Sequence, residues 1–375
     1  MAGIYIHIPF CRKACHYCNF HFSTSLKQMP AMVSAIEQEI LMRCRYLNGE
    51  KIDTIYFGGG TPSLLPEAAI ASLLTYLDFL FQVDENAEIT LEANPDDISK
   101  TKLKAWKRAG FNRLSIGVQS FSDSSLQWMN RAHHSAQSVE AVELAQAIGF
   151  SNISIDLIYG VPGMSDADWE QDVHKAIALQ VPHLSCYALT VEPRTALDKM
   201  IRTKKSVDID ADTQARQFSI LTQKLAEAGF EHYEISNFAK PGFRSRHNSS
   251  YWQGTPYLGL GPSAHSFNGT SRQWNTSNNA LYLSCIKEEI VPCEQEILSS
   301  VQQLNEYIMT SLRTIEGIDL NRVATRWGNA QMDALLLTAG KYLESGRLTQ
   351  IDQRLQLTEE GKFLADGIAA DLFSA

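Results

Sequence analysis

Three cysteines near the start of the sequence are the residues whose types and spacing most directly indicate chemistry. Cys11, Cys15 and Cys18 form a C-x3-C-x2-C pattern directly after an apolar run. In a reducing compartment such a group is typical of metal binding rather than of disulfides. Three thiolates on one short loop suit three irons of a [4Fe–4S] cluster, and the fourth iron then keeps an open coordination position.

A structural zinc site is the alternative for the same loop. His7, His16 or His21 would complete its ligand set, because cysteine and histidine are the usual zinc ligands. An electron-transfer cluster would normally take a fourth cysteine. The cysteine spacing alone leaves these alternatives open.

A glycine-rich segment, Gly58-Gly59-Gly60-Thr61-Pro62, follows the second strand-like run of the sequence. Glycine lets the backbone approach a ligand closely and leaves amide groups free to donate hydrogen bonds. On its own the segment is equally consistent with a tight turn. Together with the cysteines it indicates a ligand site at the ends of neighbouring strands.

The elements that must position these residues alternate along the first part of the chain. Apolar, β-branched residues dominate six short runs, as expected for parallel strands buried on both faces; these are residues 3–8, 53–57, 88–93, 113–119, 153–159 and 183–191. Helical spacing follows each run, near residues 28–47, 66–81, 99–109, 135–148, 166–180 and 210–228. Because the alternation stops after about residue 235, it predicts an α/β fold with a partial (β/α)6 TIM-like barrel.

Three segments are expected from this pattern. Residues 1–235 would form the barrel with its N-terminal cluster loop, with Ser99 capping one helix and Gly110 ending it. Residues 236–297 would form connecting loops and short strands that close over a site. Residues 298–375 would form a smaller helical, winged-helix-like domain with a strand pair near 347–357.

Composition excludes some functional classes. The chain has 375 residues and a formal net charge of −9, which argues against nucleic acid as a partner. The sequence has no apolar run long enough to span a membrane, and its first residues lack the features of a signal peptide. A cytoplasmic location is therefore expected.

The motifs together resemble the radical S-adenosylmethionine (SAM) superfamily and, within it, the oxygen-independent coproporphyrinogen III oxidase-like group. The resemblance covers nearly the whole chain. It rests on the cysteine triad, the glycine-rich segment, Glu92-Ala93-Asn94-Pro95, Gly117-Val118-Gln119-Ser120-Phe121, Asn130-Arg131-Ala132-His133, Asp156-Leu157-Ile158-Tyr159-Gly160-Val161-Pro162 and Leu357-Thr358-Glu359-Glu360-Gly361.

The resemblance implies how SAM would be held. Its amino and carboxylate groups would chelate the open iron, with Gly60 and Thr61 at the amino end. Arg131 would pair with the carboxylate, and Gln119 and Asp156 would bind the ribose hydroxyls. One electron from the reduced cluster would then cleave SAM into methionine and a 5′-deoxyadenosyl radical.

Four further residues take implied roles around the same cofactor. Tyr17 would pack near the adenine. Tyr5, Gly59 and Glu92 match positions that bind a second SAM in coproporphyrinogen dehydrogenases. A core position for Tyr5 and a lysine partner for Glu92 are the alternatives.

Two departures from the oxidase pattern point to a subgroup. Phe20 stands where the oxidase motif has a fourth cysteine, and the substantial N-terminal extension of that enzyme has no counterpart before the first strand. Both features resemble the HemW-type haem chaperones, as does the H-N-x-x-Y-W pattern from His247 to Trp252. Because imidazole is a normal axial ligand of haem iron, His247 is a candidate haem ligand; a loop histidine bonded to backbone is the alternative.

The leading prediction is therefore a haem chaperone with a radical-SAM core, a [4Fe–4S] cluster, SAM and haem. Its expected partners are an electron donor for the cluster and haem-accepting respiratory proteins at the membrane surface. The main alternative is an enzyme, the oxygen-independent coproporphyrinogen III oxidase that forms protoporphyrinogen IX. A radical-SAM methyltransferase is a third possibility, because a SAM site does not reveal its substrate.

Overall fold

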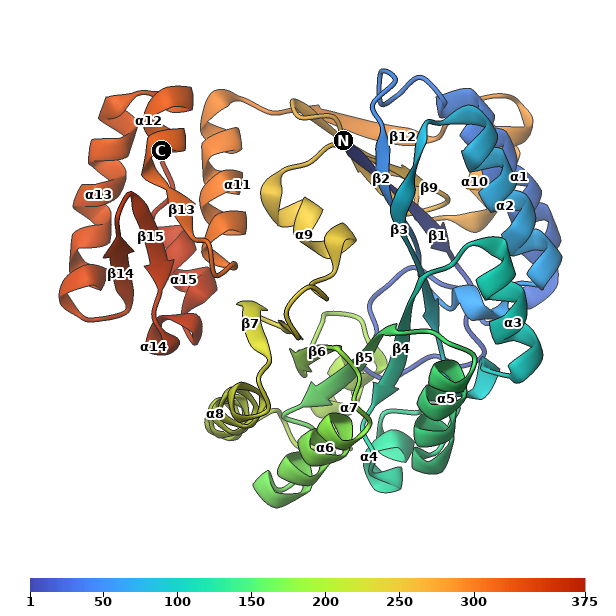
Figure 1. The fold of residues 1–375 in the computed structure, drawn as a ribbon, viewed down its shortest axis with the longest axis horizontal. Coiled ribbons are helices and arrows are strands. Elements are labelled where there is room, and N and C mark those ends of the chain that lie inside the picture. Colours follow the sequence, from blue (N-terminus) through green and yellow to red (C-terminus); the bar gives the residue numbers. More distant parts are fainter. Residues whose placement is uncertain (375) are drawn as a thin grey trace.

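The computed structural model describes residues 1–374, which form two packed units (Figure 1). The larger unit is an α/β structure, and the smaller C-terminal unit is mainly helical. Each has its own apolar core, the second one built from residues between Leu304 and Leu372. No helix among residues 1–374 is long and apolar enough to cross a membrane.

Six parallel strands form the centre of the larger unit and follow one another in sequence order. They are β1 (Ala2–Ile8), β2 (Ile52–Gly59), β3 (Val83–Ala93), β4 (Arg113–Gln119), β5 (Asn152–Tyr159) and β6 (His183–Ala188). The first and last of them do not pair with each other, since β1 continues to β9 (Tyr257–Leu260) and β6 to β8 (Asn237–Ala239). The prediction of a partial (β/α)6 barrel is confirmed.

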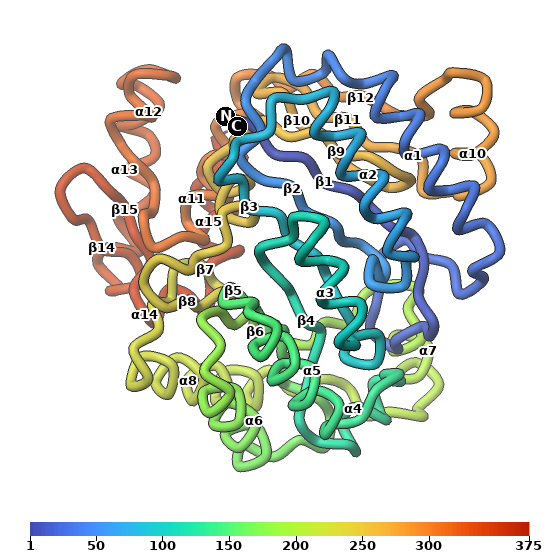
Figure 2. The backbone as a smooth tube through the Cα atoms, turned by 45° about the vertical axis from the view of Figure 1, so that its right-hand side comes forward, coloured from blue at the N-terminus to red at the C-terminus, as the bar shows by residue number. Residues whose placement is uncertain are grey.

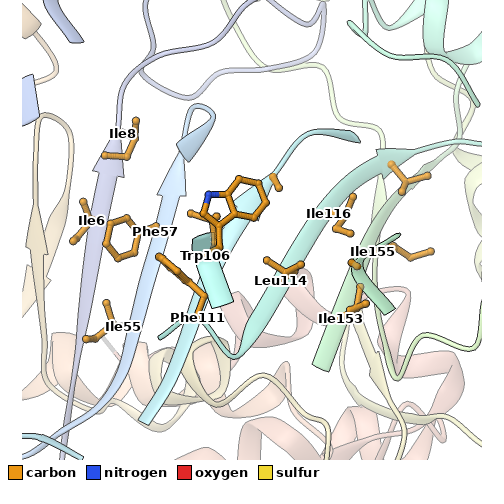
Figure 3. Packing of buried hydrophobic residues seen from close by; sticks show 14 of the residues in the cluster. Ile6, Ile8, Ile55, Phe57, Trp106, Phe111, Leu114, Ile116, Ile153 and Ile155 are labelled. Carbon is orange, nitrogen blue, oxygen red and sulfur yellow. The ribbon is translucent and has the colours of Figure 1, made fainter. Parts of the chain in front are cut away.

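Helices cover the outer face of the strands (Figures 1 and 2). They are α1 (Met29–Arg43), α2 (Glu67–Leu80), α3 (Lys100–Ala109), α5 (Ser135–Ala147), α6 (Asp166–Ala178) and α8 (Ala211–Glu227). The short helices α4 (Asp123–Trp128) and α7 (Ala196–Arg202) lie beside the cysteine loop, where the His16 amide donates to the Met129 carbonyl and the Leu197 amide to the His16 carbonyl. Figure 3 shows Trp106 of α3 lying over Phe57, Phe111 and Leu114, which are fully buried with it. Burial of such large apolar side chains is the main favourable contribution to this packing.

The ends of α3 follow the sequence prediction. The Ser99 hydroxyl accepts a hydrogen bond from the Lys102 amide at 3.3 Å. Gly110 ends the helix with a φ of 110°, a left-handed conformation that glycine adopts without a steric cost. Both residues thus act as the predicted caps.

The segment after residue 235 contains short strands, as the sequence indicates. Of these, β9, β10 (His265–Phe267), β11 (Ser271–Asn275) and β12 (Cys293–Ile297) extend the sheet beyond β1. At the opposite edge, β8 pairs with β7 (Glu231–Glu234), which lies just before this segment. The segment also contains two helices that were not predicted, α9 (Arg246–Gln253) and α10 (Asn279–Lys287). Loop-like composition hid these helices.

A buried carboxylate fixes this added edge. Glu39 of α1 is fully buried and accepts hydrogen bonds from the Gly261 amide at 2.7 Å, Asn275 Nδ2 at 2.7 Å and the Tyr282 hydroxyl at 2.6 Å. Arg43 supplies the compensating charge at 3.4 Å. Because a buried charge is tolerated only when it is well partnered, this network holds α1, β11 and α10 together.

The C-terminal unit has the predicted winged-helix-like make-up. It contains α11 (Ser300–Leu312), β13 (Ile318–Asp319), α12 (Leu320–Trp327), α13 (Asn329–Glu344), β14 (Leu348–Ile351), β15 (Arg354–Leu357), α14 (Glu359–Lys362) and α15 (Ala365–Asp371). The predicted strand pair corresponds to β14 and β15, which β13 joins in a three-stranded sheet.

Polar and aromatic contacts attach this unit to the barrel. The Ile235 amide donates to the Arg313 carbonyl and the Ile315 amide to the Tyr233 carbonyl, at 3.1 and 3.0 Å. Phe218 of α8 meets Phe363 edge to face, with ring centroids 5.0 Å apart. In Figure 1, α9 lies between α11 and the strands, and it contacts both α11 and β2.

Candidate functional site

The three cysteines lie on the loop after β1 and line one cavity of about 990 Å³. Backbone hydrogen bonds hold this loop: the Cys11 amide donates to Ser23 and the His16 amide to Met129, both at 3.1 Å. Asn130 Nδ2 also donates to the Ala14 carbonyl at 2.8 Å. The thiols are therefore presented to the cavity by a loop that is tied down on several sides.

The three histidines that could complete a zinc site have hydrogen-bond partners elsewhere. In residues 1–374, no three or more histidine, cysteine, aspartate or glutamate side chains come together as a site for a metal ion. His7 Nε2 contacts the His21 carbonyl at 2.9 Å, His16 Nδ1 the Trp128 carbonyl at 2.6 Å, and His21 Nε2 Asn279 Oδ1 at 2.7 Å.

Electrostatics around the thiols shows what metal binding would require. Burial raises the pKa of the Cys11 thiol to about 12 and also raises that of Cys18. The Thr61 hydroxyl lies 3.4 Å from the Cys11 sulfur, and Arg131 Nη1 lies 3.3 Å from the Cys15 sulfur. Metal binding must therefore displace thiol protons, and these two donors would stabilise the negative sulfurs that result.

Gly60 brings the glycine-rich loop into direct contact with the start of the cysteine loop. Its amide donates to the Ile8 carbonyl at 2.9 Å. A Cβ at this position would lie 2.6 Å from the Phe10 carbonyl oxygen and 2.7 Å from that of Ile8. Only glycine fits this approach, so the residue predicted to hold SAM also fixes the spacing between two loops of the site.

The contacts of Arg131 suit a residue that binds an anion. Its Nη2 donates to Asn94 Oδ1 and to the Gly117 carbonyl, each at 2.8 Å. Its Nε is buried and has no hydrogen-bond partner among residues 1–374. Because a buried unpaired donor is costly, this atom marks a place where a ligand carboxylate would fit.

Gln119 and Asp156 line the same cavity at the ends of β4 and β5. Gln119 has a φ of 69°, a left-handed conformation that is uncommon for a residue with a side chain. Asp156 accepts a hydrogen bond from the Ser115 hydroxyl at 3.3 Å, and burial raises its pKa to about 6. Backbone strain at Gln119 is consistent with a functional position.

Glu92 and Tyr5, two of the predicted second-SAM residues, are placed differently. Glu92 lines the cavity, as Tyr17, Gly59 and Thr61 also do, and it accepts a hydrogen bond from the Tyr56 hydroxyl at 2.7 Å. Burial raises the pKa of Glu92 to about 8. Tyr5 is not among the residues that line the cavity and packs instead against Tyr56, with ring centroids 6.2 Å apart.

His247 lies on α9, outside this cavity, rather than on a loop. It is 1% exposed, and its Nδ1 and Nε2 are bonded to Thr54 Oγ1 at 2.7 Å and the Tyr251 hydroxyl at 2.9 Å. Its ring stacks on Tyr56 at 4.9 Å. A bond from this histidine to haem iron would therefore require α9 to move away from β2.

The C-terminal unit also lines the cavity, which the sequence did not predict. Arg313, Lys362, Phe363 and Leu364 are among the residues that line it, together with Phe20 of the cysteine loop. None of these C-terminal residues belongs to a recognisable binding motif. The sequence does show aromatic and aliphatic side chains next to a lysine at the end of a short polar helix. This pattern is too common to identify a binding site.

Comparison with known proteins agrees with this architecture. Residues 5–176 match the Radical SAM superfamily, and residues 298–364 match the HemN C-terminal domain. Fold and site thus define a radical-SAM protein with a HemN-type C-terminal domain. Coproporphyrinogen III oxidase (HemN) from Escherichia coli shares the fold with a TM-score of 0.87, at 24% identity over 100% of this chain and 90% of that one.

Curated relatives give the particular family. The chain is 34% identical to the heme chaperone HemW of Bacillus subtilis, over 98% of each protein. It is 31% identical to the heme chaperone HemW of Escherichia coli, over 100% of this chain and 98% of that protein. The chain belongs to the HemW family of radical-SAM proteins.

We expect Gly60→Ala to destabilise the protein by about 1–3 kcal/mol, the usual cost of forcing extra volume into packed structure, and to impair cluster loading. The added methyl group would push the loop after β2 away from Ile8 and Phe10. Urea unfolding and iron content would be measured together. The control is Gly340→Ala, because a Cβ there meets nothing within 4 Å in helix α13; equal behaviour of the two variants would contradict the steric argument.

Glu92 should make stability depend on pH. Its pKa is raised from 4.5 to about 8, so the native state holds an extra proton between these values, and stability falls as pH rises through them. We expect Glu92→Gln to reduce this loss of stability between pH 5 and pH 8 by on the order of 2 kcal/mol, because Glu92 lines the cavity and is only partly buried. Urea titrations of wild type and variant at both pH values test this.

A matched control is the surface carboxylate Glu170. Its pKa is lowered by Lys224, so it titrates below this window and Glu170→Gln should leave the pH dependence unchanged. If Glu92→Gln kept the full wild-type slope, Glu92 would not be the group responsible.

Proposed function

We propose that this chain carries a [4Fe–4S] cluster and SAM in its barrel, binds haem, and transfers the haem to haem-dependent respiratory proteins. The observation that carries the proposal is the shared cavity. It joins the three cysteines, the unpaired Arg131 Nε and an apolar wall from the second unit. Membership of a family whose curated members are named heme chaperones supports haem as the cargo.

The residues of the cavity divide the work in this proposal. Cys11, Cys15 and Cys18 hold the cluster, which, when bound, supplies the electron that opens the sulfonium of SAM. Arg131 pairs with the SAM carboxylate, and Gln119 and Asp156 position the ribose. Gly60 and Thr61 hold the amino end, and Tyr17 packs near the adenine.

The protein acts as a carrier rather than as a coproporphyrinogen III oxidase. Phe20, which stands at the position of that enzyme's fourth cysteine, is 65% exposed and lines the cavity. A haem carrier must bind haem and release it, but it does not have to decarboxylate a substrate. The acceptors would be respiratory proteins at the membrane surface, and a reduced protein would donate electrons to the cluster.

An anaerobic haem titration of the cluster-reconstituted protein, followed by visible absorbance, tests the proposal. We expect saturable one-to-one binding with a shifted Soret band. Absence of specific binding would contradict the carrier function, and conversion of coproporphyrinogen III by the same preparation would establish the oxidase instead.

His247→Ala in the same titration decides the role of this histidine. If His247 ligates the iron, the variant loses the spectrum of imidazole-bound haem. The control is His183→Ala, because His183 is equally buried and its ring nitrogens contact Ser154 Oγ at 2.7 Å and the Tyr233 hydroxyl at 2.8 Å. Equal spectral changes in both variants would assign His247 to packing.

We expect Arg131→Ala to weaken SAM binding at least tenfold, since a charge-assisted hydrogen bond contributes about 1.5–3 kcal/mol. Calorimetry with the cluster-loaded protein measures the affinity. The conservative change Arg131→Lys keeps the charge but not the planar fork, so it should recover only part of the binding. Unchanged affinity in Arg131→Ala would refute the assignment.

A further inference from the structure

Four large apolar or aromatic side chains form part of the cavity lining, called the apolar wall below. These are Phe20, Tyr187, Phe363 and Leu364, with exposed fractions of 65%, 42%, 45% and 44%. Phe20 comes from the cysteine loop and Tyr187 from β6, whereas the other two follow α14 in the C-terminal unit. Large apolar side chains that remain exposed around one hollow mark a binding surface for an apolar ligand.

Two cations of the C-terminal unit line the same part of the cavity. Lys362 Nζ contacts His232 Nδ1 at 3.0 Å and Glu359 Oε1 at 2.7 Å. Arg313 Nε donates to Glu234 Oε1 at 3.1 Å, and its Nη1 contacts Asp366 at 3.2 Å. The cationic groups are thus anchored on the barrel side by His232 and by the buried Glu234.

Their other partners are weakly held. The side chains of Glu359 and Asp366 are 74% and 87% exposed. Ion pairs with such exposed carboxylates contribute little, because water competes for both charges. A carboxylate on a bound ligand would therefore replace Glu359 and Asp366 at small cost. Glu192, which also lines the cavity, adds negative charge at a separate position.

We infer that the apolar wall and the two neighbouring cations bind an iron tetrapyrrole. Its flat apolar face would lie against Phe363, Leu364 and Tyr187, and its propionates would pair with Lys362 and Arg313. The inference rests on the proposed carrier function and assigns it a site. The cavity of about 990 Å³ lies at the upper end of the usual range for a ligand site.

The H-N-x-x-Y-W motif reaches this site without lining it. The Arg313 guanidinium lies over the Trp252 ring at 5.2 Å, and Trp252 is on the same helix as His247. His247 in turn stacks on Tyr56, whose hydroxyl group donates a hydrogen bond to Glu92 in the cavity. The motif thus positions one cation of the tetrapyrrole site and one carboxyl group of the SAM side.

The site can be tested by titrating haem and haem dimethyl ester, in which both propionates are methyl esters, into the full-length cluster-loaded protein in the same buffer. We expect Lys362→Gln to weaken haem binding about tenfold and to leave binding of the ester unchanged, because the ester has no carboxylate to lose. Lys362→Arg keeps the charge and should bind haem like the wild type. The matched control is Lys341→Gln, since Lys341 pairs with Asp371 at 2.6 Å in the same unit but does not line the cavity.

The possible results separate the site from the function. Haem binding by wild type with equal affinity in Lys362→Gln would overturn the site and leave the carrier function standing. Equal weakening of haem and ester would also overturn it, because the effect would not depend on the carboxylates. Failure of the wild type to bind haem would overturn both proposals.

Discussion

The close contact of Gly60 with the backbone of Ile8 and Phe10 determines where everything else in the site can lie. In the parallel pairing of β1 and β2, Ile8 stands beside Gly59, so both strands end at the same level. The loops that follow β1 and β2 must then approach each other closely, and this approach is possible because Gly60 has no side chain. The cysteine loop, Arg131 and the strand ends that face it are arranged around this contact.

Much of the barrel could be predicted because its signals are local. The six strands lie within a few residues of the apolar runs, except that β3 begins earlier, at Val83. Candidate cofactor residues could be named from the sequence because each lies at a strand end or in a short motif. Their convergence follows from parallel pairing, which places the carboxyl ends of all strands on one side.

Other features of the structure could not be predicted because they depend on contacts between segments that are distant in sequence. Helix α9 had local signals, a Ser245 cap and a left-handed Gly254, but it lies in a stretch whose composition is typical of loops. The short strands beyond β1 owe their place to the buried Glu39, whose partners are more than 200 residues away. His247 looked available in the sequence because nothing there shows that Thr54 and Tyr251 engage its ring.

The walls of the cavity come from two separate cores, which has a consequence for how a cargo would leave. A molecule held between the barrel and the C-terminal unit adds to the direct contacts that join the two units, such as Arg313 with Glu234 and Phe218 with Phe363. Its occupancy would couple the unfolding of the two units, because binding to the joined state stabilises both. The rate of hand-over would then depend on how readily the two units separate, so that an acceptor protein could speed release by separating them instead of by competing for the iron.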